Sequence, residues 1–138
     1  MIVYTVGTFD LLHVGHLRLL NKCKAMGDTL LVGVASDEVV RSYKPNTPII
    51  PLSQRVEMLN ALECVDGAHS YHTLEYVSAC EKFDIDIFVV GEDWENNPHN
   101  IAVEKYLKEN GKKIVQLSYS PQTSSTKIKQ DMIDQYNA

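Results

Sequence analysis

Two histidines, His13 and His16, stand three residues apart just after the apolar run 2–6. The pattern predicts a buried strand, a glycine turn, a short loop and a helix that begins with two imidazoles. A helix N-terminus offers unpaired N–H groups and the positive end of the helix dipole. Residues three apart share one helix face, and Gly15 between them leaves room for an anion near the backbone. The segment 7–16 therefore indicates a phosphate-binding site.

The elements that must position this segment alternate between extended and helical patterns. We expect strands at 2–6, 29–35, 68–71, 85–90 and 113–117. We expect helices at 14–26, 37–43, 53–62 (capped by Ser53), 74–83, 101–110 (ended by Gly111) and 125–136. Strands that alternate with helices favour a parallel sheet. The predicted fold is α/β, a Rossmann-like doubly wound five-stranded parallel sheet with helices on both faces, in a single domain over 1–138.

The unusual segments fall after the expected strands. Segment 7–16 follows the first strand, Gly91–Trp94 the fourth and Ser118–Thr126 the fifth. Ligands of open α/β sheets bind beyond the carboxyl ends of the strands. We therefore treat these three segments as parts of one site.

Composition excludes several classes of protein. The chain has 138 residues, 44% of them hydrophobic, and a formal net charge of −5. That charge argues against a nucleic-acid partner, which usually meets a basic face. No apolar run reaches the length of a membrane span. Three cysteines without a Cys-x-x-Cys spacing indicate reduced, mostly buried thiols. We expect a cytoplasmic protein without membrane insertion.

Neither Gly-x-Gly-x-x-Gly nor Gly-x-x-x-x-Gly-Lys-Ser/Thr occurs, so a dinucleotide dehydrogenase or a P-loop NTPase is disfavoured. The string Gly7-Thr-Phe-Asp-Leu-Leu-His-Val-Gly-His16 instead resembles the signature of the cytidylyltransferase-like nucleotidyltransferases. Ser124-Ser-Thr-Lys-Ile-Lys129 resembles their second signature, and Gly91-Glu-Asp-Trp94 is similar to a segment of the small glycerol-3-phosphate cytidylyltransferases. The first string is highly specific, and the other two gain weight from it.

The resemblance implies that a phosphomonoester attacks the α-phosphate of a nucleoside triphosphate and that pyrophosphate leaves. The attacking group is already an anion, so the main need is to stabilise charge at phosphorus. By resemblance, the catalytic residues are His13, His16, Lys44, Ser125 and Thr126. The nucleotide-binding residues are Thr8, Phe9, His13, His16, Gly91, Asp93, Ser124, Ser125 and Thr126. The acceptor-binding residues are Asp10, Lys44, Arg55 and Asp66. We expect no metal site made by side chains; Mg²⁺ would come with the triphosphate.

Simpler interpretations exist for the same residues. The His pair could lie on the surface or form half of a metal site, Ser124–Thr126 and Asp10 could merely cap local structure, and Trp94 could be core packing. His69 and His72 repeat the spacing without its context, and we take them as incidental.

The chain also departs from the glycerol-3-phosphate enzymes. Glu63 and Tyr119 stand where they carry arginines, and Tyr cannot replace an Arg that is bidentate to phosphate. Either the acceptor differs or residues such as Arg41 or Lys127 compensate.

We favour CTP and a small phosphomonoester, such as glycerol 3-phosphate or a related phospho-alcohol, as substrates. The alternatives are an adenylyltransferase of the flavin or pantetheine phosphate type and a nucleotide-binding regulator without turnover. A structural metal protein is the least favoured alternative. By resemblance, we expect a homodimer.

Overall fold

Five parallel strands form one sheet in the order β3-β2-β1-β4-β5. The structure is a computed structural model and describes residues 1–118 and 124–137. The strands are β1 (Ile2–Gly7), β2 (Thr29–Ala35), β3 (Gly67–Tyr71), β4 (Ile87–Gly91) and β5 (Lys113–Leu117). The helices are α1 (Val14–Lys24), α2 (Asp37–Tyr43), α3 (Leu52–Asn60), α4 (Val77–Lys82), α5 (Pro98–Glu109) and α6 (Ser125–Tyr136). The predicted fold class is confirmed.

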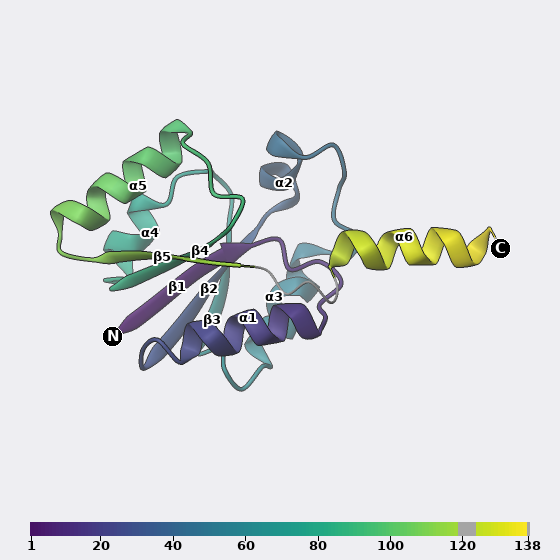
Figure 1. Cartoon of the computed structure of the whole chain (residues 1–138), viewed down its shortest axis with the longest axis horizontal. Coiled ribbons are helices and arrows are strands. Elements are labelled where there is room, and N and C mark those ends of the chain that lie inside the picture. Colours follow the sequence, from purple (N-terminus) through teal and green to yellow (C-terminus); the bar gives the residue numbers. More distant parts are fainter. Residues whose placement is uncertain (119–123, 138) are drawn as a thin grey trace.

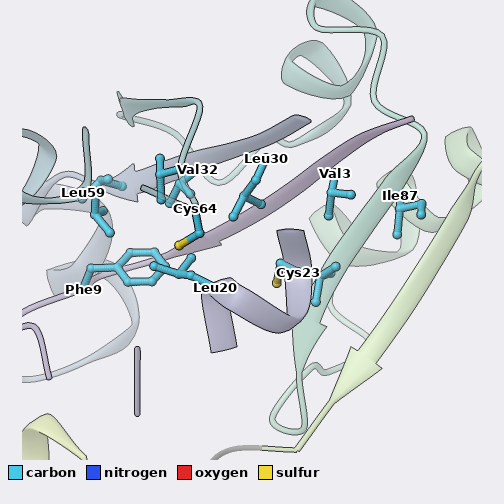
Figure 2. Packing of buried hydrophobic residues seen from close by; sticks show 12 residues of the cluster. Val3, Phe9, Leu20, Cys23, Leu30, Val32, Leu59, Cys64 and Ile87 are labelled. Atoms are coloured by element: carbon cyan, nitrogen blue, oxygen red, sulfur yellow. The ribbon is translucent and has the colours of Figure 1, made fainter. Parts of the chain in front are cut away.

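The sheet is covered on both faces (Figure 1). On one face α1 and α3 pack against side chains such as Val3, Leu30 and Ile87, as Figure 2 shows. On the other, α4 and α5 cover Tyr4 and Phe88. Successive strand residues thus enter different cores, which is why these strands read as continuous apolar runs rather than alternating ones. The three cysteines are free and buried, as expected.

The order of the strands in the sheet reverses between β1 and β4. The strands β1, β2 and β3 extend in one direction, and β4 then pairs with the other side of β1. At such a reversal of strand order, the loops leaving the two central strands separate and open a crevice at the carboxyl edge. The segments that follow β1 and β4 are Thr8–His13 and Glu92–Asn97. The topology therefore brings the histidine segment and the Gly91–Trp94 segment to one crevice.

Several helix ends differ from the sequence predictions. Ser53 does not cap α3, which begins at Leu52 after Pro51. Helix α4 begins only at Val77, because the Glu75 carboxylate accepts from the Ser78 N–H group just inside it. Helix α5 begins earlier than expected, at Pro98, since the Asn97 side chain accepts from a backbone N–H group of its first turn.

Helix α6 projects from the body of the domain, and none of its described residues is buried (Figure 1). Its predicted apolar stripe is largely exposed: the exposed fractions are 61% for Met132, 54% for Ile133 and 91% for Tyr136. No helix in the described part of the chain is long and apolar enough to cross a membrane. The substitutions around Tyr119 that distinguish this chain from the glycerol-3-phosphate enzymes lie outside the described residues, which end at 118 and resume at 124.

Candidate active site

The loop between β1 and α1 has an unusual backbone. Phe9 and Leu11 adopt the left-handed conformation, with φ of 53° and 49°, which costs energy for residues with a side chain. A Cβ atom on Gly7 would lie 2.9 Å from Cε2 of Phe9, so glycine is needed where the aromatic ring folds back. The buried Phe9 ring lies against the His16 ring, with centroids 5.5 Å apart. The strained loop thus places the Phe9 ring against the imidazole of His16 and helps to fix its position.

His13 and His16 hold each other at the start of α1. His13 is the N-cap, one residue before the helix, which begins at Val14 as the sequence predicted. Its Nδ1 accepts from the Gly15 N–H at 3.0 Å, and its own N–H donates to Nδ1 of His16 at 3.2 Å. The ring centroids are 3.9 Å apart. This is a capping box built from two imidazoles.

The capping box fixes the tautomer of both rings. A nitrogen that accepts a hydrogen bond carries no proton, so in the neutral ring the proton sits on Nε2. Burial lowers the pKa of His13. Burial and the neighbouring His13 lower the pKa of His16 to about 4. At neutral pH, both rings therefore offer an Nε2–H donor beside the N-terminus of α1, an arrangement suited to phosphate oxygens.

The lowered pKa of His16 predicts that acid destabilises the fold. The unfolded ring binds a proton near its ordinary pKa of 6.5, whereas the folded ring does so only near 4. Between these values the unfolded state binds more protons, so stability is lost as pH falls from about 6.5 to 4. We expect a loss of about 1–3 kcal/mol after allowance for solvent screening. Urea unfolding at a series of pH values should show a flatter profile for His16→Gln, and an unchanged profile would contradict the assignment.

Asp10 is buried, with only 3% of its surface exposed. Its two carboxylate oxygens accept from the N–H groups of Ile49 and Ile50 at 2.8 and 2.9 Å, and Lys129 lies 3.0 Å from Oδ2. Burial alone would raise the pKa of Asp10, but these donors outweigh it and lower that pKa. In the structure Asp10 therefore holds the loop that follows α2, and its acceptor contact stays a prediction.

Arg55 has a similar internal role, and only 1% of its surface is exposed. Its guanidinium donates to the carbonyl oxygens of Ile50, Thr8 and Ala35 and pairs with Asp37, at 2.7–2.9 Å. The sequence placed it on the acceptor phosphate. In the structure, four of its N–H groups instead donate to internal partners at the carboxyl edge of the sheet. Asp37, the carboxylate partner, was not among the predicted site residues.

Asp66 does not join the site. It precedes β3 and so lies at the amino edge of the sheet, opposite the histidines. There its carboxylate accepts from the Leu30 N–H at 2.7 Å and pairs with Lys24 at 2.6 Å. The structure thus places Asp66 away from the histidines, and the preceding Cys64 and Val65 are buried without forming a strand.

The Ser/Thr turn does meet the histidine segment. Ser124 caps α6 by accepting from the Lys127 N–H at 3.0 Å. The Ser125 hydroxyl donates to the carbonyl oxygen of Asp10, 115 residues away in sequence. Thr126 follows in the first turn of the same helix. Two signatures from opposite ends of the chain thus share one site, each at a helix N-terminus.

Lys44 and Thr8 lie at the same edge. Lys44 is exposed at the end of α2, with Nζ 5.6 Å from the centre of the Tyr43 ring. The Tyr43 hydroxyl is 3.5 Å from Oγ1 of Thr8. The end of α2 therefore reaches the loop that carries the histidines, and it brings the Lys44 ammonium group to the same edge of the sheet.

The segment after β4 separates into an exposed and a packed part. Gly91 ends the strand, and Asp93 is exposed beyond it. Trp94 packs on Tyr76 and Phe88 and donates its indole N–H to Glu104 at 2.6 Å. Trp94 is therefore an anchor for the loop, in line with the core-packing interpretation.

The described residues contain no cluster of three or more His, Cys, Asp or Glu side chains that could hold a metal ion. Donors dominate instead: imidazole N–H groups, helix N-termini, hydroxyls and Lys44. Such a set suits an anion that brings its own cation. The sequence analysis did not predict a site role for Lys129, which pairs with Asp10. The one feature that could have indicated it is its position one helical turn after the Ser/Thr turn.

Comparison with known proteins agrees with this geometry. Residues 4–131 match the model of the family described as cytidylyltransferase-like. A glycerol-3-phosphate cytidylyltransferase of Staphylococcus aureus is 35% identical over 94% of this chain and 93% of its own length. A FAD synthase of Thermococcus onnurineus is 34% identical over 94% of this chain and 89% of its own.

Other relatives are larger or differ in name. The bifunctional protein HldE of Hydrogenovibrio crunogenus is 37% identical over 92% of this chain, which spans only 26% of that protein. A lipopolysaccharide core biosynthesis protein of Thermoplasma volcanium has a crystal structure that superimposes with a TM-score of 0.72 at 27% identity, over 87% of this chain and 96% of that one. With its two signatures joined at one edge of a parallel sheet, the chain belongs to the cytidylyltransferase-like family of nucleotidyltransferases.

Proposed function

We propose that this protein transfers CMP from CTP to a small phosphomonoester and releases pyrophosphate. The observation that carries the proposal is the pair of neutral imidazoles whose Nε2–H groups are fixed at the start of α1. They suit an α-phosphoryl group, where negative charge is redistributed during transfer. The likeness to a glycerol-3-phosphate cytidylyltransferase over nearly the whole of both chains supports CTP and a phospho-alcohol.

The transfer needs no strong general base. An oxygen of the acceptor phosphate forms a bond to the α-phosphorus, the bond from that phosphorus to the β-bridging oxygen breaks, and pyrophosphate leaves with the electron pair. His13 and His16 donate to the phosphoryl oxygens, and Lys44 supplies a positive charge from the end of α2. The N-terminus of α6, with Ser124, Ser125 and Thr126, receives the β- and γ-phosphates. Thr8 and Phe9 add donors from the loop, and Gly91 and Asp93 border the nucleoside.

The substrate is taken to be the Mg²⁺ complex of the triphosphate. The nearest buried carboxylate, Asp10, has both oxygens occupied by internal donors. The ion would therefore be held by phosphate and water, and it would supply charge neutralisation. The side chains orient the phosphates around it.

A second candidate is adenylyl transfer from ATP to a flavin phosphate. It is favoured by the likeness to a FAD synthase, at an identity close to that of the cytidylyltransferase. The base-reading part of the site must decide between the two, because the phosphate-binding part suits both. A regulator without turnover has no use for donors aimed at an α-phosphate.

The deciding experiment is pyrophosphate release with Mg²⁺ from each of four nucleoside triphosphates. The acceptor panel is led by glycerol 3-phosphate and includes a flavin phosphate and pantetheine phosphate. Turnover with CTP and a phospho-alcohol supports the proposal. Turnover only with ATP and the flavin phosphate selects the second candidate. Nucleotide binding without release from any pair selects the regulator.

The proposed enzyme is a homodimer in which a second copy covers the apolar face of α6. A 12-residue helix alone is marginal in water, and this one exposes Met132, Ile133 and Tyr136. We expect Ile133→Asp to give a monomer by light scattering. Asp134→Lys, on the opposite face, should leave the dimer intact. A monomeric wild type, or a dimeric Ile133→Asp variant, would contradict this arrangement.

A further inference from the structure

A buried carboxylate links the histidine loop to the segment that carries Lys44. Asp10 lies in the loop after β1, and its oxygens accept from the N–H groups of Ile49 and Ile50. These two residues belong to the connection between α2 and α3, which begins at Lys44. The connection contains three prolines and only short-range turns, so its placement depends on such contacts from outside.

The peptide at Ile50 is held from both sides. Its N–H group donates to Asp10 at 2.9 Å, and its carbonyl accepts from Nε of Arg55 at 2.9 Å. Arg55 comes from the well-packed helix α3, where it is almost completely buried. The Arg55 contact to Ile50 is therefore fixed by the packing of α3. The Asp10 contact to Ile50 comes from the side that faces α6.

Lys129 provides the charge that balances Asp10. Its Nζ lies 3.0 Å from Oδ2, and it comes from the second turn of α6. The same helix approaches the loop at Ser125, whose hydroxyl donates to the Asp10 carbonyl oxygen. Because no described residue of α6 is buried, these polar contacts hold the helix against the domain. A carboxylate that is 3% exposed is costly without a cation.

We propose that Lys129 is a positioning residue, which couples the phosphate-binding turn of α6 through Asp10 to the loop that carries Lys44. The inference rests on the proposed function, because Lys44 acts there on the transferred phosphate. The coupled elements are the N-terminus of α6, the loop after β1 and the connection between α2 and α3. When α6 is in place, Asp10 is paired and the backbone of Ile49 and Ile50 is fixed. Lys44, five residues before Ile49, is then held at the site.

Removal of the Lys129 charge should loosen this connection without unfolding the domain. The ion pair is at the edge of the site, and the lysine side chain is 32% exposed, so water can reach the vacated position. Asp10 then has a weaker hold on the two N–H groups. Local opening of a hydrogen-bonded segment is seen directly as faster amide hydrogen exchange.

The experiment uses the full chain with Lys129→Met, Lys129→Arg and Lys105→Met. Lys105 pairs with Glu109 on the surface of α5 at 3.9 Å and gives the same change in net charge. We expect Lys129→Met to speed exchange at the Ile49 and Ile50 amides, measured by NMR, by about tenfold. The kcat for pyrophosphate release should also fall about tenfold, with the KM for nucleotide within about twofold. Lys129→Arg should restore both, and Lys105→Met should match the wild type.

Wild-type exchange at Ile49 and Ile50 in Lys129→Met would overturn the coupling. Faster exchange with unchanged kcat would overturn the positioning role, because the contact would then be structural only. Exchange is measured without substrate. A failure of the proposed function, seen as no pyrophosphate from the wild type with any pair, is therefore distinct from a failure of the coupling.

Discussion

His16→Ala is expected to lower kcat for nucleotidyl transfer by about 10²–10⁴-fold in a protein that remains folded. The variant removes an Nε2–H donor that the fold has oriented before substrate arrives. His16 is fixed through Nδ1 by the His13 N–H and by contact with the Phe9 ring. Such preorganised donors act on the transition state more than on the bound substrate, so we expect the effect mainly in kcat.

His16→Ala also removes the side chain that accepts a hydrogen bond from the N-cap residue of α1. Loss of the bond between the His13 N–H and His16 should cost about 0.5–2 kcal/mol of stability. His16→Gln separates the two roles, because glutamine at the third helical position can still accept from the N-cap N–H. We expect this variant to keep wild-type stability and to remain inactive. Pyrophosphate release and urea unfolding, measured on both variants, decide the point.

His72→Ala is the matched control. His72 repeats the spacing with His69, but it is exposed, and its Nε2 lies 3.1 Å from the Ser70 hydroxyl. Its loss should leave turnover within about twofold of wild type. Turnover within tenfold of wild type in His16→Ala would reject the assigned role of the imidazole pair, whatever the activity of the control.

The fold was largely predictable because it rests on local patterns. A continuous apolar run marked β2 with the observed bounds, since both of its faces are covered. Strand β5 also has the predicted bounds, although it is a partly exposed strand at the edge of the sheet. The glycine at 111 marked the end of α5, and it does adopt a positive φ of 67°. Helix starts were less accurate where a side chain decides them. Asn97 followed by Pro98 is a typical helix start. The predicted start at residue 101 followed the apolar periodicity instead of this signal.

The charged residues of the site were predicted by type but not by partner. Asp10 and Arg55 were assigned to the acceptor, yet Asp10 accepts from backbone groups 39 and 40 residues away, and Arg55 donates to backbone groups up to 47 residues away. Such partners depend on how loops from different strands pack, and the local sequence does not predict that packing. The histidines differ because their geometry is local: both bonds of the capping box span three residues or fewer.

Arg55→Met is expected to cost about 3–5 kcal/mol of unfolding free energy, because it leaves buried polar groups without partners. The carbonyl oxygens of Thr8, Ala35 and Ile50 would lose their donor, and Asp37 would lose its cation. Against a total stability of about 5–15 kcal/mol for a typical domain, this is a large fraction. Arg55→Lys should recover only part, since an ammonium cannot reproduce the planar fork.

Chemical denaturation of Arg55→Met, Arg55→Lys and Lys22→Met distinguishes the internal role from acceptor binding. Lys22 is exposed on α1, and its replacement should change stability by no more than about 0.5 kcal/mol. An arginine that bound the acceptor phosphate would, when replaced, raise the KM for acceptor and leave stability unchanged. Wild-type stability in Arg55→Met, together with a raised acceptor KM, would therefore restore the acceptor contact and refute the internal one. Loss of stability with Arg55→Lys intermediate would place Arg55 among the groups that build the site rather than those that touch substrate.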